Sequence, residues 1–331
     1  MTTEPLDVVG IGNAIVDVLV PSDDAFLTKH DLKKGTMALI DEARAGTLYA
    51  AMGAGVEASG GSCGNTMAGI ASLGGKGAYI GKVRDDSLGQ VFAHDLRSIG
   101  VRFDTTPLNG GPSTARCLIL VTPDAQRTMN TYLGACVELG PEDIDPELIA
   151  SAQITYLEGY LFDPPRAKEA FRKAAKIAHD SGRKVSLSLS DPFCVDRYRD
   201  EFRDLVANHV DILFANEVEI CSLYQVNDFE TALDRVRGHA EIAALTRSEQ
   251  GSVVVTRDRE HRIAAATPKQ LVDSTGAGDL YASGFLYGLT HGKDLATCGK
   301  LGSLAAAEAI SHYGARPAVS LKELAGRANL I

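Results

Sequence analysis

Short apolar runs recur along the chain, separated by stretches in which apolar residues return every three or four positions. The first run, Leu6–Gly12, ends in glycines and is typical of a buried strand. Later runs also predict strands: Ala78–Gly81, Ile154–Leu157, Lys184–Leu189, Ile212–Ala215, Ala243–Thr246 and Ser252–Thr256. Between many of them the spacing is helical, most plainly from Arg166 to Asp180, where one face is apolar and the other charged. Because strands alternate with helices, the pattern predicts an α/β fold with a doubly wound, mostly parallel sheet.

Two stretches, residues 15–58 and 103–135, do not follow this alternation. The first begins with the apolar run Ile15–Val20 and continues through polar sequence to a short candidate strand, Thr36–Ile40. The second contains two alternating runs around Pro123–Gln126, which predicts a β-hairpin. We expect both stretches to leave the main body, residues 1–14, 59–102 and 136–331, and to pair as a small β-sheet lid. Such a lid can exclude water from a reaction site.

Composition narrows the classes of function. The chain has 331 residues, 45% of them hydrophobic and 23% charged, which suggests about two globular domains or one large domain with an appendage. The formal net charge is -10, which argues against nucleic acid as a partner, because phosphate backbones are bound by clustered Lys and Arg. An acidic protein that binds a phosphate ligand must therefore build a local anion site, largely from backbone N–H groups.

The chain also lacks the usual marks of a membrane or secreted protein. No run approaches the ~20 apolar residues that a membrane-spanning helix needs, and no basic segment precedes a long apolar stretch near the N-terminus. The cysteines are scattered, without a C-x-x-C pair: Cys63, Cys117, Cys136, Cys194, Cys221 and Cys298. We expect reduced, mostly buried thiols in a cytoplasmic protein, with no zinc site or disulfide framework.

The segment Asp273–Tyr281 carries the strongest chemical signal. Its Thr-Gly-Ala-Gly turn, which ends in Gly276, Ala277 and Gly278, opens a helical stretch. Such a turn points several backbone N–H groups at one place, where the helix dipole adds positive potential suited to a phosphate. Asp279 follows in the first helical turn and could accept a proton from an attacking hydroxyl. The alternative is that this acidic residue only caps a structural helix.

A second motif, Gly60-Gly-Ser-Cys-Gly-Asn65, leads into another helical stretch. Glycines such as Gly61 allow the backbone to approach a ligand closely, and Asn65 offers a donor and an acceptor to a sugar hydroxyl. The alternative is a turn with an Asn cap.

A third motif, Asn216-Glu-Val-Glu219, follows a strand. On a helical turn Asn216 and Glu219 share a face, and an amide with a carboxylate suits a hydrated Mg²⁺ that bridges nucleotide phosphates. The alternative is an Asn-capped helix with a capping-box glutamate.

The N-terminal glycines, Gly10 and Gly12, could belong to a dinucleotide fingerprint. That motif requires a third glycine where this chain has Ile15, and the run that follows is β-like, so the sequence disfavours a nicotinamide site. Asn13 and Asp17 instead provide an amide and a carboxylate near a strand end. A carboxylate that accepts two hydroxyl protons would hold a pair of vicinal hydroxyls.

Taken together and in this order, the three motifs resemble the signatures of the ribokinase family, also called the phosphofructokinase-B type. That family has an N-terminal Gly-Gly motif ending in Asn, a central Asn-x-x-Glu and a C-terminal Asp-Thr-x-Gly-Ala-Gly-Asp. The resemblance covers nearly the whole chain, although Ser274 stands where Thr is common and Tyr281 where Phe is. It implies a ribokinase-like fold with a β lid and ATP-dependent phosphoryl transfer to an alcohol group.

The resemblance also implies residue roles in catalysis and metal binding. Asp279 would be the general base, and the Gly276–Gly278 segment would form the anion hole. Asn216 and Glu219 would organise Mg²⁺ and the phosphates through water.

Further roles concern the nucleotide. Thr246–Gly251 is similar to the family's nucleotide-binding loop, usually Thr-x-Gly-x-x-Gly, with Ser248 in place of the middle glycine. Thr246, Ser248 and Gly251 would therefore contact ATP, and Ser303 would lie beside its adenine. The family often binds a monovalent cation such as K⁺ near the position of Asp273, which leaves such a site open here.

For the acceptor, the chain resembles the adenosine-phosphorylating members of the family. Asn13 and Asp17 match an Asn-x-x-x-Asp that meets the ribose. Arg127 begins a segment similar to their arginine-led lid strand, so it would offset charge on the transferring phosphate, with Met129 and Thr131 touching the base. Phe193, in Leu-Ser-Asp-Pro-Phe, would line the base pocket. An ordinary hairpin and a core Phe are the alternatives.

The activity implied is phosphorylation of the 5′-hydroxyl of adenosine to AMP, a purine-salvage reaction. Family sugar kinases commonly have a charged group within the Gly-Gly motif, where this chain has Ser62-Cys63-Gly64. A less polar pocket favours a nucleobase. Kinases of ribose, fructose or other nucleosides remain alternatives, as does a nucleoside-binding regulator without turnover. Either a monomer or a homodimer is compatible with the sequence.

Overall fold

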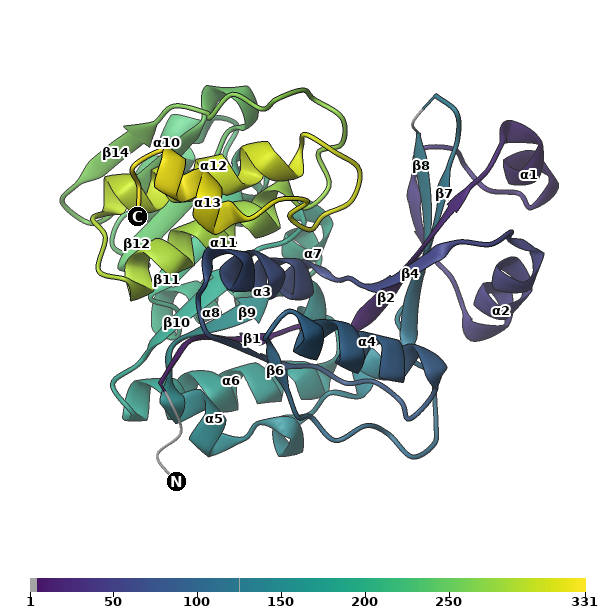
Figure 1. Ribbon diagram of the computed structural model, residues 1–331. Helices are drawn as coiled ribbons and strands as arrows, with labels where there is room; N and C mark the ends of the chain where they lie inside the picture. The colour runs from purple at the N-terminus through teal and green to yellow at the C-terminus, as the bar shows by residue number, and fades with distance from the viewer. Residues whose placement is uncertain (1–4, 125) are drawn as a thin grey trace.

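The computed structural model describes residues 5–124 and 126–331, and its strands form two sheets (Figure 1). The larger, nine-stranded sheet has the order β14-β13-β12-β11-β10-β9-β1-β5-β6. Strands β6 to β12 of this order are parallel, and β13 and β14 add an antiparallel edge. The bounds are β1 Leu6–Ile11, β5 Gly77–Ile80, β6 Arg102–Phe103, β9 Ala152–Glu158, β10 Lys184–Ser188, β11 Ile212–Asn216, β12 Ile242–Thr246, β13 Ser252–Val255 and β14 Glu260–Ile263.

Helices cover both faces of the large sheet, because its strands are apolar on both sides. On one face, Val9 and Leu157 pack with residues from α6, α8, α9 and α10. On the other, Val8 and Tyr156 pack with residues from α3, α4 and α11. The helices are α3 Ser62–Leu73, α4 Ser87–Ser98, α5 Pro146–Ser151, α6 Pro165–Asp180, α7 Pro192–Arg197, α8 Arg199–Asn208, α9 Glu217–Tyr224, α10 Phe229–Val236, α11 Ala277–Thr290, α12 Leu295–Ala309 and α13 Leu321–Arg327. The predicted doubly wound α/β fold is confirmed.

The smaller sheet has five strands in the order β3-β8-β7-β2-β4 and lies beside the main body (Figure 1). Its strands are β2 Ile15–Pro21, β3 Met37–Leu39, β4 Val56–Ser59, β7 Ala115–Val121 and β8 Arg127–Tyr132. The predicted hairpin is present, since β7 and β8 pair antiparallel; its turn includes residue 125, outside the described residues. The expected small β-sheet therefore exists. Its action as a lid and its boundaries remain predictions.

The two faces of the small sheet differ in character. Val16, Val18 and Leu118 pack with Leu27 of α1 (Asp24–Lys29) and Leu48 of α2 (Glu42–Ala51). The sequence predicted polar chain where α1 lies and no element where α2 lies. These helices lie on the side of the small sheet away from the main body (Figure 1). The opposite face carries Asp17. In the register of the sheet, Asp17 on β2 is followed across the strands by Cys117 on β7, Thr131 on β8 and Leu39 on β3. This row is apolar except for one carboxylate and one hydroxyl.

The parallel strands end along one edge of the large sheet, and the candidate residues follow these ends. Asn13 comes after β1, Glu158 ends β9, and Asn216 ends β11. In open α/β sheets, ligands bind outside the carboxyl ends of the strands. The fold therefore collects these polar groups, together with the starts of α3 and α11, at the edge where a ligand site is expected.

Candidate active site

Asp279 occupies the first turn of α11 and faces the first turn of α3. Its carboxylate accepts a hydrogen bond from Ser62 Oγ at 2.6 Å and another from Asn65 Nδ2 at 3.0 Å. Burial raises the pKa of Asp279, and the two donors act in the opposite direction. The C-terminal and N-terminal motifs, 217 residues apart at Ser62 and Asp279, thus meet. Asn65 orients the carboxylate by means of its amide donor, a role that the sequence did not assign to it.

The backbone before α11 is shaped for an anion. Gly276 has φ 77°, and a Cβ there would lie 2.5 Å from the Cβ of Ala315, so only glycine fits. No atom lies within 4 Å of where a Cβ on Gly278 would be, which leaves open space above the helix start. Together with Ala277, these residues present the start of α11, a 14-residue helix, toward that space. Helix N-termini of this kind attract phosphate.

The Gly60–Gly61 turn lies directly on the predicted acceptor residues. A Cβ on Gly60 would overlap the carboxylate of Asp17, and a Cβ on Gly61, which has φ 81°, would lie 2.5 Å from the carbonyl oxygen of Asn13. The turn therefore requires both glycines. It brings Asn13 and Asp17 beside the start of α3, whose residues Ser62 and Asn65 bond Asp279.

Glu158 links Asn13 to the start of α3 by hydrogen bonds. It was not identified as a site residue from the sequence. One of its oxygens accepts hydrogen bonds from Asn13 Nδ2 at 2.8 Å and from Asn13 N at 3.3 Å. The other accepts from Cys63 N at 2.8 Å. The side chain is 1% exposed, and burial raises its pKa to about 7. Burial likewise raises the pKa of Asp17 to about 6, with Arg127 and Arg316 lowering it.

Arg127, on the small sheet, pairs with Asp273 at the end of the loop before α11. The same carboxylate accepts hydrogen bonds from Thr275 N at 3.0 Å, Thr275 Oγ1 at 2.7 Å and Gly314 N at 3.4 Å. Arg127 thus joins the small sheet to the anion loop through Asp273 and forms no hydrogen bond or ion pair with Asp279.

The three residues expected to line a base pocket do not lie together. Met129 and Thr131 lie on the face of the small sheet that also carries Asp17, and Thr131 Oγ1 donates to Cys117 Sγ at 3.3 Å. Phe193, near the start of α7, is 72% exposed and so is no core residue. Nothing in the structure brings Phe193 into contact with Met129 or Thr131.

Asn216 and Glu219 form a reciprocal capping box at the start of α9. Asn216 Nδ2 and N donate to the two Glu219 oxygens at 2.6 and 2.9 Å, and Glu219 N donates to Asn216 Oδ1 at 2.9 Å. Burial raises the pKa of Glu219 to about 7. Within the described residues no group of three or more His, Cys, Asp or Glu could hold a metal ion. The pair fits Mg²⁺ only through water, as an ion carried by nucleotide phosphates requires few protein ligands.

The predicted nucleotide loop follows β12, which ends at Thr246. Ser248 has φ 51°, so it adopts the left-handed conformation at the position where the family's loop usually has glycine. Gly251 has φ 85°, and a Cβ there would overlap the Ile263 carbonyl. Ser303, on α12, accepts from Ala266 N at 2.8 Å and so holds the chain beyond β14.

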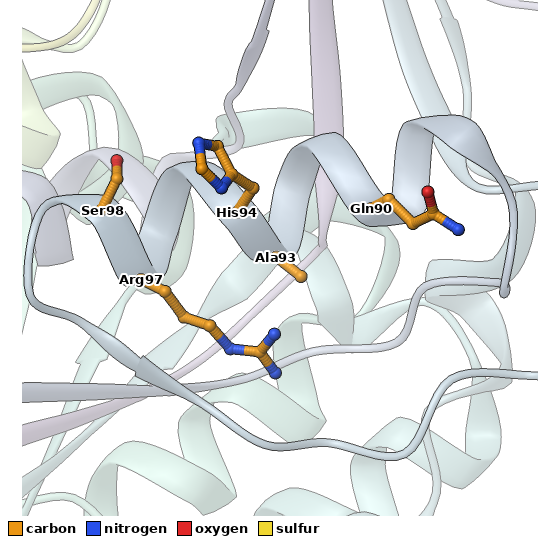
Figure 2. Close-up of a pocket in the computed structure, with 5 residues that line it drawn as sticks. All are labelled: Gln90, Ala93, His94, Arg97 and Ser98. Carbon is orange, nitrogen blue, oxygen red and sulfur yellow. The ribbon is translucent and has the colours of Figure 1, made fainter.

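A surface depression along α4 shares no residue with this site. Figure 2 shows it lined by Gln90, Ala93, His94, Arg97 and Ser98. Arg97 Nη2 donates to the carbonyl oxygen of Phe103 at 2.6 Å, so its guanidinium secures the chain after β6. We assign no function to this depression. Across residues 5–124 and 126–331, the helices are too short or too polar to cross a membrane.

An α/β fold with a small second sheet, an open glycine-lined helix start and an adjacent carboxylate defines a phosphotransferase of small molecules. The model of the pfkB family of carbohydrate kinases matches residues 33–322, and the chain belongs to this family. Membership implies an ATP-dependent kinase with a small-molecule acceptor.

Two solved structures and one further relative match nearly the whole chain. A probable sugar kinase from Rhizobium etli is 54% identical with a TM-score of 0.92, over 99% of this chain and 100% of that one. Adenosine kinase from Sinorhizobium meliloti is 54% identical with a TM-score of 0.90, over 98% and 100%. Adenosine kinase from Saccharomyces cerevisiae is 27% identical over 335 residues, 94% of this chain and 96% of the yeast protein.

Proposed function

We propose that the protein phosphorylates the 5′-hydroxyl of adenosine with ATP, giving AMP and ADP. The observation that carries the proposal is the meeting of three groups in one pocket. Asp279 lies at the open start of α11 and is hydrogen-bonded to α3, whose preceding glycine turn rests on Asn13 and Asp17. A hydroxyl beside Asp279 would then have a proton acceptor on one side and an anion site on the other.

The pocket offers separate surfaces for a ribose and a base. The Asp17 carboxylate accepts no hydrogen bond from the described residues, so it is available to accept protons from a vicinal diol, and Asn13 is held in place by Glu158. The part of the small sheet next to Asp17 is formed by Cys117, Met129 and Thr131, none of which is charged. An apolar face beside a diol acceptor suits a nucleoside better than a free sugar.

The remaining residues are assigned to the phosphates and the nucleotide. Asp279 takes the hydroxyl proton, and the N–H groups at Gly276–Gly278 bind the transferring phosphoryl group. Arg127 adds positive charge when the small sheet closes as a lid. Asn216 and Glu219 would hold Mg²⁺ through water, and the ion would neutralise phosphate charge. Thr246, Ser248, Gly251 and Ser303 would contact ATP.

A sugar acceptor is the second candidate. The polar end of the pocket, with Asn13, Asp17 and Glu158, also suits a polyol, and the R. etli relative is called a probable sugar kinase. We also propose a K⁺ site near Asp273, a cytoplasmic location and a role in purine salvage. Either a monomer or a homodimer is compatible with the proposal.

Substrate choice and the role of Asp17 are tested together. Adenosine, 2′-deoxyadenosine, ribose and fructose are assayed with ATP and Mg²⁺, and we expect adenosine to have the highest kcat/KM. Calorimetry then compares adenosine and 2′-deoxyadenosine on the wild type and on Asp17→Ala. The Asp17→Ala substitution should weaken the binding free energy of adenosine by roughly 1.5–3 kcal/mol. It should weaken that of 2′-deoxyadenosine by less. Additive losses would mean that Asp17 does not touch the 2′-hydroxyl, and higher kcat/KM for ribose would favour the sugar kinase.

A further inference from the structure

Arg316, in the segment between α12 and α13, is anchored to the candidate active site by its own backbone neighbours. Gly314 N donates to Asp273 Oδ2 at 3.4 Å. Ala315 packs against Gly276, where a Cβ would come within 2.5 Å of the Ala315 Cβ. The segment is therefore fixed against the loop that opens α11, and the Arg316 side chain starts from a defined position.

Two of the three guanidinium nitrogens of Arg316 are buried and lack partners. Its Nε and Nη2 atoms are inaccessible to solvent and have no hydrogen-bond acceptor within the described chain. Nη2 lies 3.7 Å from where a Cβ on Gly64 would be, so the group rests on the first turn of α3. Burial lowers the pKa of Arg316, and the carboxylates that act against this are Asp17 and Asp95. Unsatisfied donors of this kind are costly, and they indicate a role beyond packing.

Of these two carboxylates, Asp17 is the one without a partner of its own. Asp95 Oδ2 accepts from Ser59 N at 2.8 Å. The Asp17 carboxylate accepts no hydrogen bond within the parts of the chain that the structure describes, and it lies against Gly60, four residues before Gly64. A partly buried cation and a partly buried anion thus flank the start of α3, and neither has a hydrogen-bonded partner of opposite charge in the described residues.

We propose that Arg316 is the counter-charge of Asp17 and thereby a positioning residue for the acceptor diol. The part of this inference that concerns the diol rests on the proposed function. A carboxylate receives two hydroxyl protons only when it is ionised, and a nearby cation favours the ionised form. Arg316 binds no substrate in this scheme and acts through Asp17.

Arg127 lowers the pKa of Asp17 more than Arg316 does, but it has a carboxylate partner of its own, and the remaining groups oppose this effect. The partner of Arg127, which lies on β8, is Asp273. Asp279 on α11 disfavours it, and the Cys117 thiol on β7 has its pKa raised to about 12 by burial and by Asp17. Arg316 is therefore the cation near Asp17 that has no carboxylate paired with it in the described residues.

The first test measures the ionisation of Asp17 in the free enzyme. Protein labelled with ¹³C at the Asp carboxyl carbons is titrated by NMR, and Asp17→Asn identifies the signal. In Arg316→Met we expect the midpoint to rise by about one pH unit or more, whereas Arg316→Lys keeps the charge and stays near the wild type. Arg102→Met, at an exposed arginine paired with Asp104, is the matched control and should change nothing. An unchanged midpoint in Arg316→Met, or equal shifts in the Lys and Met variants, would overturn the proposal.

The second test follows function. KM and kcat for adenosine are measured across pH, and the rise of KM on acidification should begin at higher pH in Arg316→Met, with kcat changed little. The effect should be weaker for 2′-deoxyadenosine. A fall confined to kcat would contradict the proposal. If the wild type does not phosphorylate adenosine, the proposed function fails, while the carboxyl titration still decides the role of Arg316. If melting shows that Arg316→Met is unfolded, Arg316→Gln is titrated in its place, with the same expected rise.

Discussion

Replacing Asp279 by asparagine separates the two roles that a carboxylate can have at this position. The substitution is nearly isosteric, and the amide oxygen can still accept from Ser62 Oγ, which donates to Asp279 at 2.6 Å. The new amide NH₂ would face Asn65 Nδ2, now 3.0 Å from Asp279. Turning the Asn65 amide presents its oxygen instead, so both contacts survive. We therefore expect a folded protein that lacks only the proton acceptor.

The expected loss in rate follows from the chemistry of proton transfer. General base catalysis contributes typically 10²–10⁴ in rate, so kcat should fall by that factor, or about 3–5 kcal/mol in activation free energy. Adenosine binding should change little, because the proposed acceptor contacts are made by Asn13 and Asp17. Single-turnover kinetics gives the rate of the chemical step, and calorimetry gives the binding constant.

The stability of Asp279→Asn has a predictable sign. Burial raises the pKa of Asp279, so the native state favours the neutral carboxyl and the ionised form costs stability at neutral pH. Removing the charge should leave the melting temperature unchanged or higher near neutral pH, and the gain should disappear as the pH falls towards the ordinary carboxyl pKa of ~4. Ser62→Ala, which keeps the base, is the control and should lose much less kcat. A kcat within threefold of the wild type would refute the general-base assignment, and an unfolded variant would support helix capping.

Two further substitutions test the residues around the base. Glu219→Gln should raise the Mg²⁺ concentration for half-maximal activity more than it raises the KM for adenosine, since Glu219 is assigned to the metal side; an unchanged Mg²⁺ titration would leave only the capping box. Glu158→Gln should raise KM, because its amide must present N–H to the N–H of Cys63 or Asn13. Since burial raises the pKa of Glu158 to about 7, the melting temperature of this variant relative to wild type should increase as pH rises from about 4.5 to 7. If the difference in melting temperature between the variant and the wild type did not depend on pH, burial would not raise the pKa of Glu158.

Much of the fold follows from local patterns. The helix predicted from Arg166 to Asp180 is α6, Pro165–Asp180, because its alanines and Phe171 repeat at helical spacing and all face the core. The short helices α1 and α2 were not predicted, since few of their residues are buried: Leu27 in α1, and Ala45 and Leu48 in α2. Their packing on the small sheet is a tertiary effect that no local window contains.

The site shows the same division. The motif residues could be recognised singly, and the structure adds which of them are engaged with one another: Asn65 with Asp279, and Asn216 with Glu219. Glu158 could not be found, because its partner Asn13 lies 145 residues away. The sequence did contain one indication of its role, because Glu158 directly follows the apolar run Ile154–Leu157 at a predicted strand end.

The acceptor pocket concentrates charge that the fold alone would not favour. Asp17, Glu158 and Asp279 all have pKa values raised by burial, so each destabilises the empty protein when it is ionised. Paired structural carboxylates would have lowered values. Burial without full compensation is typical of groups tuned for proton transfer or for a ligand's hydroxyls. Glu158 already accepts hydrogen bonds from Asn13 and Cys63, so Asp17 and Asp279 are the carboxylates that would gain from the hydroxyl protons of a ligand. This argument favours the proposed hydroxylated acceptor over an anionic one.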